Sequence, residues 1–408
     1  MKIGVVLSFI KTLIAVNFLQ VDQFSQYAVF LSISYFLSYL LSFGSVEGSV
    51  KSFPRFVELN KFVFVKINIL KITLKLFRNA FFLFFSLVLV SGFISFSFID
   101  IVLIVLLALT GSLSSLFASY LRALGRLSEM ALSNTIRAFF ILALIFLFSQ
   151  LENNYHSMII AEVLGSLFGI YLYFRFSSLS LCGFNINISK FLKLIGNKKM
   201  HSGLGSGGKF VAFAYFVNSI PFYLDKWLST HFLVSSEVGV FVFSSTLLAV
   251  ALVIMNLISQ YIGANLIVLT SSSPFLQIAI YVVKWAAVGV STWFAFLATY
   301  YTLYYYGLLP DGLLKYNLGF KVILILALLG ASFVTQIFEF ILIGYDRERL
   351  FFLSAAGHIA LLVMLLLISY NKELNAVGLI SYLVIARSGY FILLVLSLFV
   401  SRKDFINA

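Results

Sequence analysis

Residues 209–247 read KFVAFAYFVNSIPFYLDKWLSTHFLVSSEVGVFVFSSTL, and this stretch decides the fold. Pro221 and the adjacent Asp225 and Lys226 interrupt an apolar run, a short polar turn follows, and a second apolar run begins at Gly239. A weaker copy stands at the N-terminus. When Lys11 is aligned with Asp225 without gaps, similar residues fall together: Phe18 and Leu19 on Phe232 and Leu233, Gln23 on Glu237, Phe24 on Val238, Ser25 on Gly239, and Tyr27 on Phe241. This pattern predicts an internally duplicated chain.

The composition is that of a polytopic membrane protein. Of 408 residues, 62% are hydrophobic and only 11% are charged, which is too few polar side chains to cover a water-soluble domain. Runs of roughly 20 apolar residues match the ~30 Å hydrocarbon core as helices, and the alternating segments of about ten residues found in membrane β-barrels are absent. We therefore expect an all-α fold of about twelve transmembrane helices in two pseudo-symmetric six-helix lobes.

The expected spans divide the chain into an N-lobe at 1–180, an amphipathic and glycine-rich linker at 181–208, and a C-lobe at 209–408. The spans lie at about Ile3–Leu19, Phe24–Phe43, Ala80–Phe98, Ile101–Tyr120, Ala131–Phe148, Met158–Phe174, Phe210–Thr230, Gly239–Ile262, Leu276–Leu303, Leu318–Ile343, Leu350–Ile368 and Ala376–Phe399. A second sign of duplication is Tyr120-Leu121-Arg122 after the fourth span and Tyr345-Asp346-Arg347 after the tenth, an offset of 225.

Lys and Arg gather in alternate loops, which gives the expected orientation. The connections after the second, fourth, sixth, tenth and last spans carry almost all of them, and the other loops hold only Lys315 and Lys372. Because short cytoplasmic loops hold an excess of Lys and Arg, both termini are predicted to be cytoplasmic. In two of the basic connections, Asn68–Arg78 and Ile188–Lys199, a spacing of three or four residues predicts a helix lying in the membrane interface.

Several function classes have little support. The single Cys182 excludes a disulfide framework, and no cluster of Cys or His predicts a metal or other cofactor. GLGSGGK at Gly203–Lys209 satisfies the spacing of a phosphate-binding loop, but Phe210 replaces the Ser or Thr and no strand precedes it, so we interpret it as a flexible linker. The net charge of +13 is explained by the cytoplasmic loops, and no nucleic-acid partner is expected.

Ionisable residues inside the expected spans are the candidate functional residues. Each costs about 2.5–3.5 kcal/mol at the membrane centre on insertion scales, and such groups usually face a partner or a water-filled cavity. Cations outnumber anions here, which favours a cavity that receives something negative. The cations are Lys11, Arg137, Lys226, Lys284, Lys321 and Arg387; the anions are Glu162, Asp225 and Glu339; His358 is a weaker member. Lys321 lies near a helix start, where it is able to reach the interface.

The chain resembles the polysaccharide transporter branch of the multidrug/oligosaccharidyl-lipid/polysaccharide (MOP) exporter superfamily, and within it the O-antigen flippases. The residues that carry the resemblance are DKWL at 225–228 leading to EVGVF, its N-terminal echo QFSQY, and YLRALGR at 120–126, within paired six-helix halves of MATE-like arrangement. The chain departs from the Gly-x-Tyr of many relatives with Ser25-Gln26-Tyr27 and Gly239-Val240-Phe241.

The resemblance implies a flippase that moves an undecaprenyl-diphosphate-linked oligosaccharide, the O-antigen repeat unit, to the periplasmic leaflet of the bacterial inner membrane. For such a substrate, we expect the cations inside the spans to contact the diphosphate or sugar, namely Lys11, Arg387, Lys284, Arg137 and Lys226. We expect Asp225, Glu162 and Glu339 to balance charge or to couple transport to an ion gradient. Membrane lipids, a polysaccharide polymerase and a chain-length regulator are the expected partners of a monomeric transporter without a cofactor.

Two other functions stay open at this point. One is a cation-coupled multidrug exporter of the same superfamily, in which the first helix would carry an acid, whereas this chain has Lys11. The other is a membrane glycan polymerase or glycosyltransferase. We do not expect an enzyme, because such proteins present a large catalytic loop and the longest expected external loop runs only from about Tyr304 to Asn317.

Overall fold

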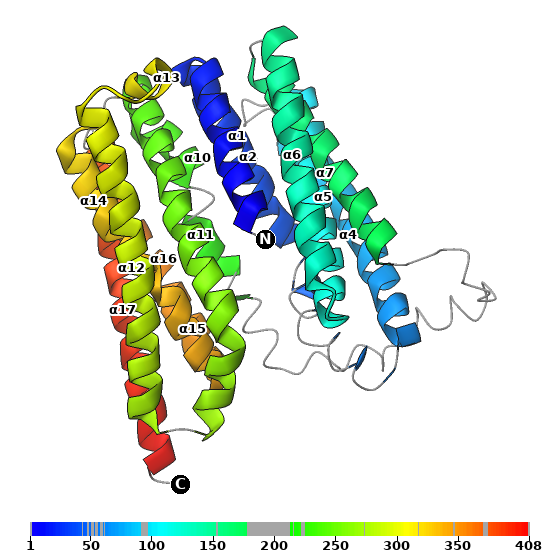
Figure 1. Ribbon diagram of the computed structural model, residues 1–408, viewed down its shortest axis with the longest axis vertical. Helices are drawn as coiled ribbons and strands as arrows, with labels where there is room; N and C mark the ends of the chain where they lie inside the picture. The colour runs from blue at the N-terminus through cyan, green and yellow to red at the C-terminus, as the bar shows by residue number, and fades with distance from the viewer. Residues whose placement is uncertain are drawn as a thin grey trace. The chain divides into compact units, whose positions relative to one another are not determined.

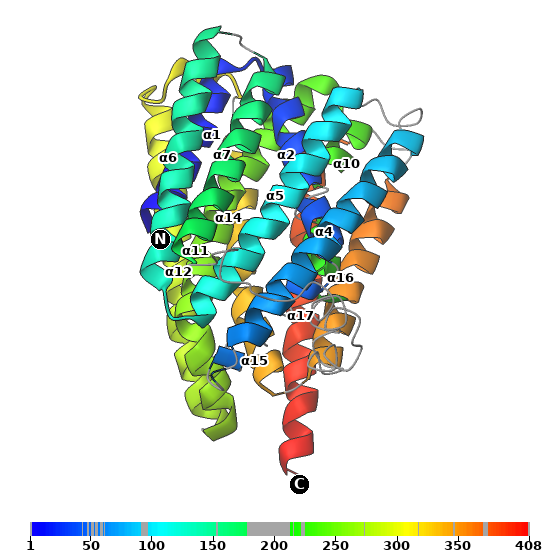
Figure 2. The ribbon, with the colours of Figure 1, turned by 90° about the vertical axis from the view of Figure 1, so that its right-hand side faces the viewer.

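The computed structural model describes residues 2–406 except 43, 47–48, 50–52, 54–55, 58–59, 61, 91–96, 152–153, 178–212, 215, 222–224, 273, 317, 346 and 370–373. The described part is built of helices, as expected (Figures 1 and 2). Ten of the described helices are long and apolar enough to cross a membrane. The first expected span is a helix of 17 residues, and the seventh falls partly outside the described residues.

The chain forms two compact units. Unit 1 consists of residues 1–15 and 30–212, and unit 2 of residues 16–29 and 213–408. The described helices of unit 1 are most of α1 (Lys2–Phe18) and α2 (Val21–Ser42), then α4 (Phe62–Val90), α5 (Phe98–Ala123), α6 (Leu127–Leu151) and α7 (Tyr155–Phe176). Those of unit 2 are α10 (Asp225–Phe232), α11 (Ser235–Ser272), α12 (Phe275–Tyr305), α13 (Asp311–Leu314), α14 (Phe320–Ala331), α15 (Thr335–Gly344), α16 (Glu348–Ile368) and α17 (Ala376–Ile406).

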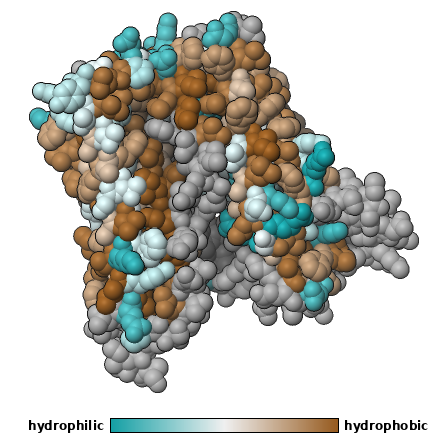
Figure 3. All heavy atoms as spheres, viewed as in Figure 1, coloured by the Kyte–Doolittle hydropathy of each residue, from teal (hydrophilic) through white to brown (hydrophobic). Residues whose placement is uncertain are grey.

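Apolar side chains cover much of the face in Figure 3. Exposed residues such as Phe81, Phe82 and Leu89 have 60–81% of their surface accessible, which suits contact with lipid rather than water. Within each unit, the last described helix packs on several others. α7 packs on α5 and α6 in unit 1, and α17 packs on α14, α15 and α16 in unit 2.

The ends of the helices bear out the first duplication. α1 ends at Phe18 and α10 at Phe232, while α2 begins at Val21 and α11 at Ser235. Both pairs are 214 positions apart, the same offset that aligns Lys11 with Asp225. The break between the two helices therefore falls at the same place in each copy.

The second sequence match, between the two Tyr-x-Arg motifs, is one helical turn out of register with the structure. The backbone N–H of Arg126 bonds to Leu121 O at 2.9 Å, and the N–H of Arg347 bonds to Leu342 O at the same distance, as each helix ends. This pairs residue 126 with residue 347, an offset of 221 rather than 225. α7 and α17, which begin at Tyr155 and Ala376, keep the offset of 221. The offset from the Tyr-x-Arg motifs is wrong by four residues. Residues four apart occupy the same face of a helix, so the two registers resemble each other in sequence.

The expected interfacial helix at Asn68–Arg78 is wrong. The third span was predicted to begin at Ala80, but α4 runs without a break for 29 residues from Phe62 to Val90. No Pro or Gly interrupts this sequence, so no residue in it ends the helix early. The second expected interfacial helix, Ile188–Lys199, and the segment Gly203–Lys209 lie outside the described residues.

The described end of the seventh expected span is the helix α10, which begins at Asp225. The tenth consists of α14, a 3₁₀ turn at Ser332–Val334, and α15. The hydroxyl of Ser332 donates to Leu329 O at 2.6 Å, the kind of local side-chain bond that bends a helix.

The connection between α12 and α14 holds the tip of the α1–α2 hairpin, which also belongs to unit 2. The Nζ of Lys315 donates to Val16 O at 2.8 Å and to Leu19 O at 2.6 Å. The ring of Tyr316 stacks on Phe243 with centroids 4.5 Å apart. Burial raises the pKa of the Tyr316 phenol, which therefore stays neutral. Lys315, an exception to the loop charge bias, is thus explained as a cap for the last carbonyls of α1.

Candidate functional site

A buried ion pair joins the first and last described helices of unit 1. The Nζ of Lys11 on α1 donates to the Glu162 carboxylate on α7, and the two residues are only 8% and 2% exposed. From the sequence, different roles were expected for the two side chains, diphosphate contact and charge balance. The structure brings them together, so neither charge is available alone.

Arg137 adds a second cation beside this pair. It lies on α6 and interacts electrostatically with Lys11 and Tyr173. Its aliphatic stem packs on Gly169 of α7, where a Cβ would overlap it. The Nε of Arg137 is buried and has no hydrogen-bond partner within the described residues. Lys11, Glu162 and Arg137 thus form a cluster, the unit 1 charge cluster, with one more cation than anions.

A different polar network lies in the core of unit 2. The Glu339 carboxylate on α15 accepts hydrogen bonds from Tyr390 Oη at 2.8 Å and from Asn218 Nδ2 at 3.0 Å. The Nδ1 of His358 lies 3.3 Å from Asn218 Oδ1, and the His358 ring stacks on Tyr390 with centroids 5.1 Å apart. Arg387, 3% exposed, interacts electrostatically with Glu339. We call these five residues the unit 2 polar cluster.

The unit 2 polar cluster balances one cation with one anion and adds an imidazole. His358 is fully buried, and its Nε2 has no hydrogen-bond partner among the described residues. The guanidinium of Arg387 lies over the rings of Phe333 and Tyr390, 5.0 and 5.7 Å from their centroids. Such contacts stabilise a cation that is buried. A buried carboxylate whose hydrogen bonds come from neutral donors is a group able to take up and release a proton.

Asp225 and Lys226 form an ion pair with each other. The Nζ of Lys226 lies 3.7 Å from Asp225 Oδ1, and the second carboxylate oxygen accepts from Ser245 Oγ at 2.5 Å. Adjacent residues of a helix ordinarily point about 100° apart, but Asp225 is the first residue of α10. At a helix start the side chain reaches back, and Asp225 also accepts from the Lys226 backbone N–H at 2.7 Å.

Lys284 and Lys321 lie apart from these clusters. Lys284 is exposed on α12 between Ile280 and Val288, which are also exposed. Lys321, the second residue of α14, is exposed at the helix start, as its sequence position predicted. Neither side chain belongs to the buried networks of unit 2 that the structure describes.

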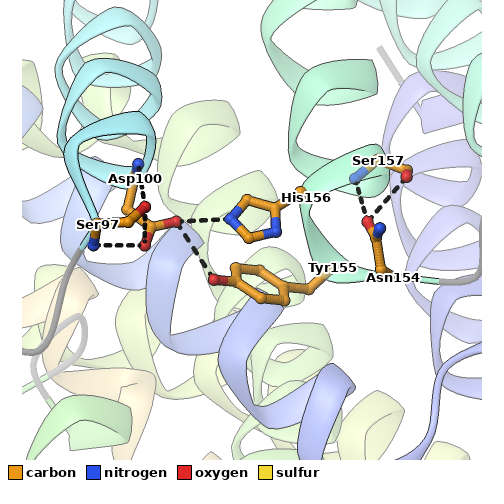
Figure 4. A network of polar contacts seen from close by, with 6 residues as sticks. All are labelled: Ser97, Asp100, Asn154, Tyr155, His156 and Ser157. Atoms are coloured by element: carbon orange, nitrogen blue, oxygen red, sulfur yellow. Dashed lines mark hydrogen bonds and ion pairs between the residues drawn. The ribbon is translucent and has the colours of Figure 1, made fainter.

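A further polar group, which the sequence did not single out, joins the starts of α5 and α7 (Figure 4). Asp100 Oδ2 accepts from the Ser97 backbone N–H at 2.9 Å. Asp100 Oδ1 accepts from Tyr155 Oη at 3.3 Å and lies 3.0 Å from His156 Nε2. Asn154 accepts from the backbone N–H of Ser157 at 2.9 Å and so caps α7. This group fixes two helix ends, and we assign it to stability.

Asn218 and Tyr390 were also not predicted from the sequence. Asn218 interrupts the apolar run VAFAYFVNSI, and that interruption was a signal. Tyr390 follows Arg387 by three residues and so lies on the same helix face, but 21 tyrosines in the chain hide one that is buried.

Two units with membrane-length helices, each with ionisable side chains in its core, indicate a multi-pass membrane protein. No protein-family model and no curated protein sequence matches the chain. Solved structures do match it along almost its whole length.

One is a ligand complex of the MATE multidrug transporter DinF-BH, with a TM-score of 0.68 and 15% identity over 99% of this chain and 94% of that one. Another is an inward-facing multidrug resistance MATE family transporter of the MOP superfamily, with a TM-score of 0.65 and 12% identity over 98% and 94%. A third is a MOP superfamily transporter from Pyrococcus furiosus, described as having a binding pocket of reverse polarity, with a TM-score of 0.57 and 12% identity over 98% and 93%. The chain therefore has the fold of the MATE transporters of the MOP superfamily.

Proposed function

We propose that the chain is a flippase for a lipid-linked oligosaccharide carried on undecaprenyl diphosphate, acting by alternating access in the bacterial inner membrane without catalysis. The observation that carries the proposal is the surplus cation of the unit 1 charge cluster. Glu162 neutralises Lys11, which leaves Arg137 to attract an anion. A guanidinium binds phosphate through two parallel hydrogen bonds and stays charged when desolvated.

The unit 2 polar cluster supplies a group for ion coupling. Protonation of Glu339 would break its balance with Arg387 and change the bonds that Tyr390 and Asn218 donate to the carboxylate. A proton moving down its gradient would in this way bias the packing of α15 against α17. Arg387 was expected from the sequence to contact the diphosphate. Here its proposed role is to hold Glu339 in position through its charge.

A multidrug exporter of the same superfamily is the second candidate. The observation that favours it is that two carboxylates inside the expected spans of unit 2 are buried: Asp225 and Glu339 are 6% and 3% exposed and suit a cationic substrate or coupling ion. DinF-BH, which shares this fold, is described as a multidrug transporter. The reverse-polarity pocket described for the Pyrococcus furiosus protein is, in contrast, a precedent within this fold for a different substrate charge.

Transport in proteoliposomes separates the two candidates. The probes are undecaprenyl diphosphate carrying a short fluorescent oligosaccharide and, in parallel, a cationic rhodamine dye, each with and without a proton gradient. We expect transbilayer movement of the diphosphate lipid and no accumulation of the dye. Dye transport without lipid movement would refute the flippase proposal and support the multidrug exporter.

Variants then test the residue that carries the proposal. Arg137→Gln should lower the initial rate of lipid movement by at least about tenfold, since one charge-assisted contact to phosphate is worth roughly 1.5–3 kcal/mol. Lys321→Gln is the matched control, because it removes an exposed charge of the same sign. Equal rates for Arg137→Gln and the control would remove Arg137 from the mechanism.

Inside a bacterium, we expect O-antigen assembly to fail when the gene is lost, with lipid-linked repeat units collecting on the cytoplasmic side. A polymerase and a chain-length regulator would use the product on the other side of the membrane. Both termini would lie in the cytoplasm, and the transporter would work as a monomer.

A further inference from the structure

Two arginines of unit 1 lie toward the same end of three packed helices. α5 and α6 are joined by the short connection 124–126, and α6 and α7 by residues 152–154, so α5 and α7 end on the side where α6 begins. Arg122 is in the last turn of α5. Arg137 follows the start of α6 by about 15 Å of helix rise.

Both arginines approach the phenol of Tyr173 on α7. The stem of Arg137 packs on Gly169, and Tyr173 lies one turn further toward the end of α7 on the same face. Side chains lean toward the N-terminus of their helix, so Arg137 leans toward the start of α6, and Arg122 leans inward from the end of α5. Both guanidiniums interact electrostatically with the phenol, which belongs to a residue only 1% exposed. Two cations from two helices therefore converge on one buried hydroxyl.

Asn134 holds this hydroxyl and adds a donor. Tyr173 Oη donates to Asn134 Oδ1 at 2.7 Å. Asn134 precedes Arg137 by three residues, so both side chains lie on the same face of α6. The amide nitrogen of Asn134 makes no hydrogen bond within the described residues, which leaves it able to donate to a ligand beside the guanidinium.

No carboxylate in the described part of the chain forms an ion pair with either arginine. The neighbouring cations Lys11 and Arg126 each have a carboxylate partner, Glu162 and Glu129. The phenol is neutral and does not balance a positive charge. A guanidinium binds one phosphoryl group through two parallel hydrogen bonds, so two guanidiniums without carboxylates suit a ligand with two phosphoryl groups.

We infer that Arg122 and Arg137 each bind one phosphoryl group of the diphosphate, with Asn134 as a further donor, and that Arg122 makes the site select a diphosphate over a monophosphate. The inference rests on the proposed function and adds a specificity-determining residue to it. Arg122 is exposed at the helix end, whereas Arg137 is partly buried and lies further along its helix. A lipid entering from this end would meet Arg122 first, and a monophosphate would engage only one of the two guanidiniums.

The affinity of the full-length protein in detergent for two lipids tests the inference, with undecaprenyl diphosphate and undecaprenyl phosphate as the probes and native mass spectrometry as the measurement. The wild type should bind the diphosphate more tightly. Arg122→Gln should weaken diphosphate binding about fivefold, which corresponds to about 1 kcal/mol for one cation near an anionic group at a membrane surface. Monophosphate binding should stay unchanged in this variant, which also shows that it is folded. Arg137→Gln should weaken the binding of both lipids.

Arg175→Gln is the matched control. Arg175 is also an exposed arginine at this end of unit 1, but it follows Tyr173 by two residues and so lies about 200° further around α7. Its removal should leave both affinities at the wild-type values, and Arg122→Lys, which keeps the charge, should keep most of the diphosphate affinity.

Two results would overturn the inference. In one, Arg122→Gln loses no more diphosphate affinity than Arg175→Gln; in the other, it loses affinity for both lipids equally. The proposed function would survive either result as long as the wild type binds the diphosphate. A wild type that binds neither lipid would refute the proposed function together with the inference.

Discussion

Replacing Lys315 with methionine should loosen the tip of the α1–α2 hairpin from the rest of unit 2. The Lys315 ammonium bonds two carbonyls at the end of α1, Val16 O at 2.8 Å and Leu19 O at 2.6 Å. The last carbonyls of a helix have no partner inside the helix, and they carry the negative end of its dipole. Methionine has a similar shape to the lysine stem but offers neither a donor nor a charge.

The size of the effect follows from the exposure of the side chain. Hydrogen bonds from a charged group are worth about 1.5–3 kcal/mol when buried, and a cation at a helix C-terminus about 0.3–1 kcal/mol. Lys315 is exposed apart from its ammonium, and partial burial lowers its pKa from the ordinary value, which indicates a desolvation cost. The net contribution is therefore about 1–2 kcal/mol, at the low end of these ranges.

Thermal unfolding in detergent measures this contribution of Lys315 to stability. For a unit of about 200 residues, 1–2 kcal/mol corresponds to a decrease in Tm of roughly 2–8 °C. Lys315→Arg should recover part of the loss, because it keeps the charge and the donors. Lys321→Met removes an exposed lysine from the start of α14 and should change Tm by about 1 °C or less. If Lys315→Met and Lys321→Met have the same Tm, the two hydrogen bonds of Lys315 do not hold the hairpin.

Other substitutions test the buried ion pair and the helix caps. Glu162→Gln leaves the Lys11 ammonium unpaired and should destabilise the protein by about 3–5 kcal/mol, whereas the double variant with Lys11→Met should recover most of the thermal stability. Asn154→Ala and Asn375→Ala each remove a side-chain cap and should each cost about 1 kcal/mol, seen as similar decreases in Tm. Asp100→Asn weakens the group at the start of α5 and α7 and should cost about 1–3 kcal/mol, with faster hydrogen exchange at both helix starts as the measurement.

The sequence predicted the helical class and the first duplication because both depend on local pattern. A span is a run of apolar residues, and the break between α1 and α2 lies at the same offset as the break between α10 and α11. It did not predict where α4 begins. Polar residues before Ala80 suggested a separate interfacial helix, yet a continuous helix keeps Lys71, Lys75 and Arg78 on a face away from the core and meets no steric obstacle.

The candidate site was predicted as a set of residues but not as a set of pairs. Lys11 and Glu162 are 151 residues apart and meet only because α1 and α7 come together in the fold. No local sequence pattern predicts this contact. Composition alone could identify six cations and three anions inside the spans. It could not show that Lys11 and Asp225 each have an immediate partner, or that Lys284 lies on an exposed face.

The offset of 221 relates Arg137 to His358 and Gly169 to Tyr390, and the structure shows the same helix contact in both units. In unit 1 the Arg137 stem packs on Gly169, and in unit 2 the His358 ring stacks on Tyr390. Gly169 leaves room for a long side chain, whereas Tyr390 fills that room and meets a flat ring. A guanidinium is always charged, whereas an imidazole is able to be neutral. One contact, duplicated, thus holds a permanent cation in unit 1 and, in unit 2, an aromatic ring that bonds Asn218, a neighbour of the Glu339 carboxylate. Binding an anion and coupling to protons, the two tasks proposed for the two units, would need this difference between them.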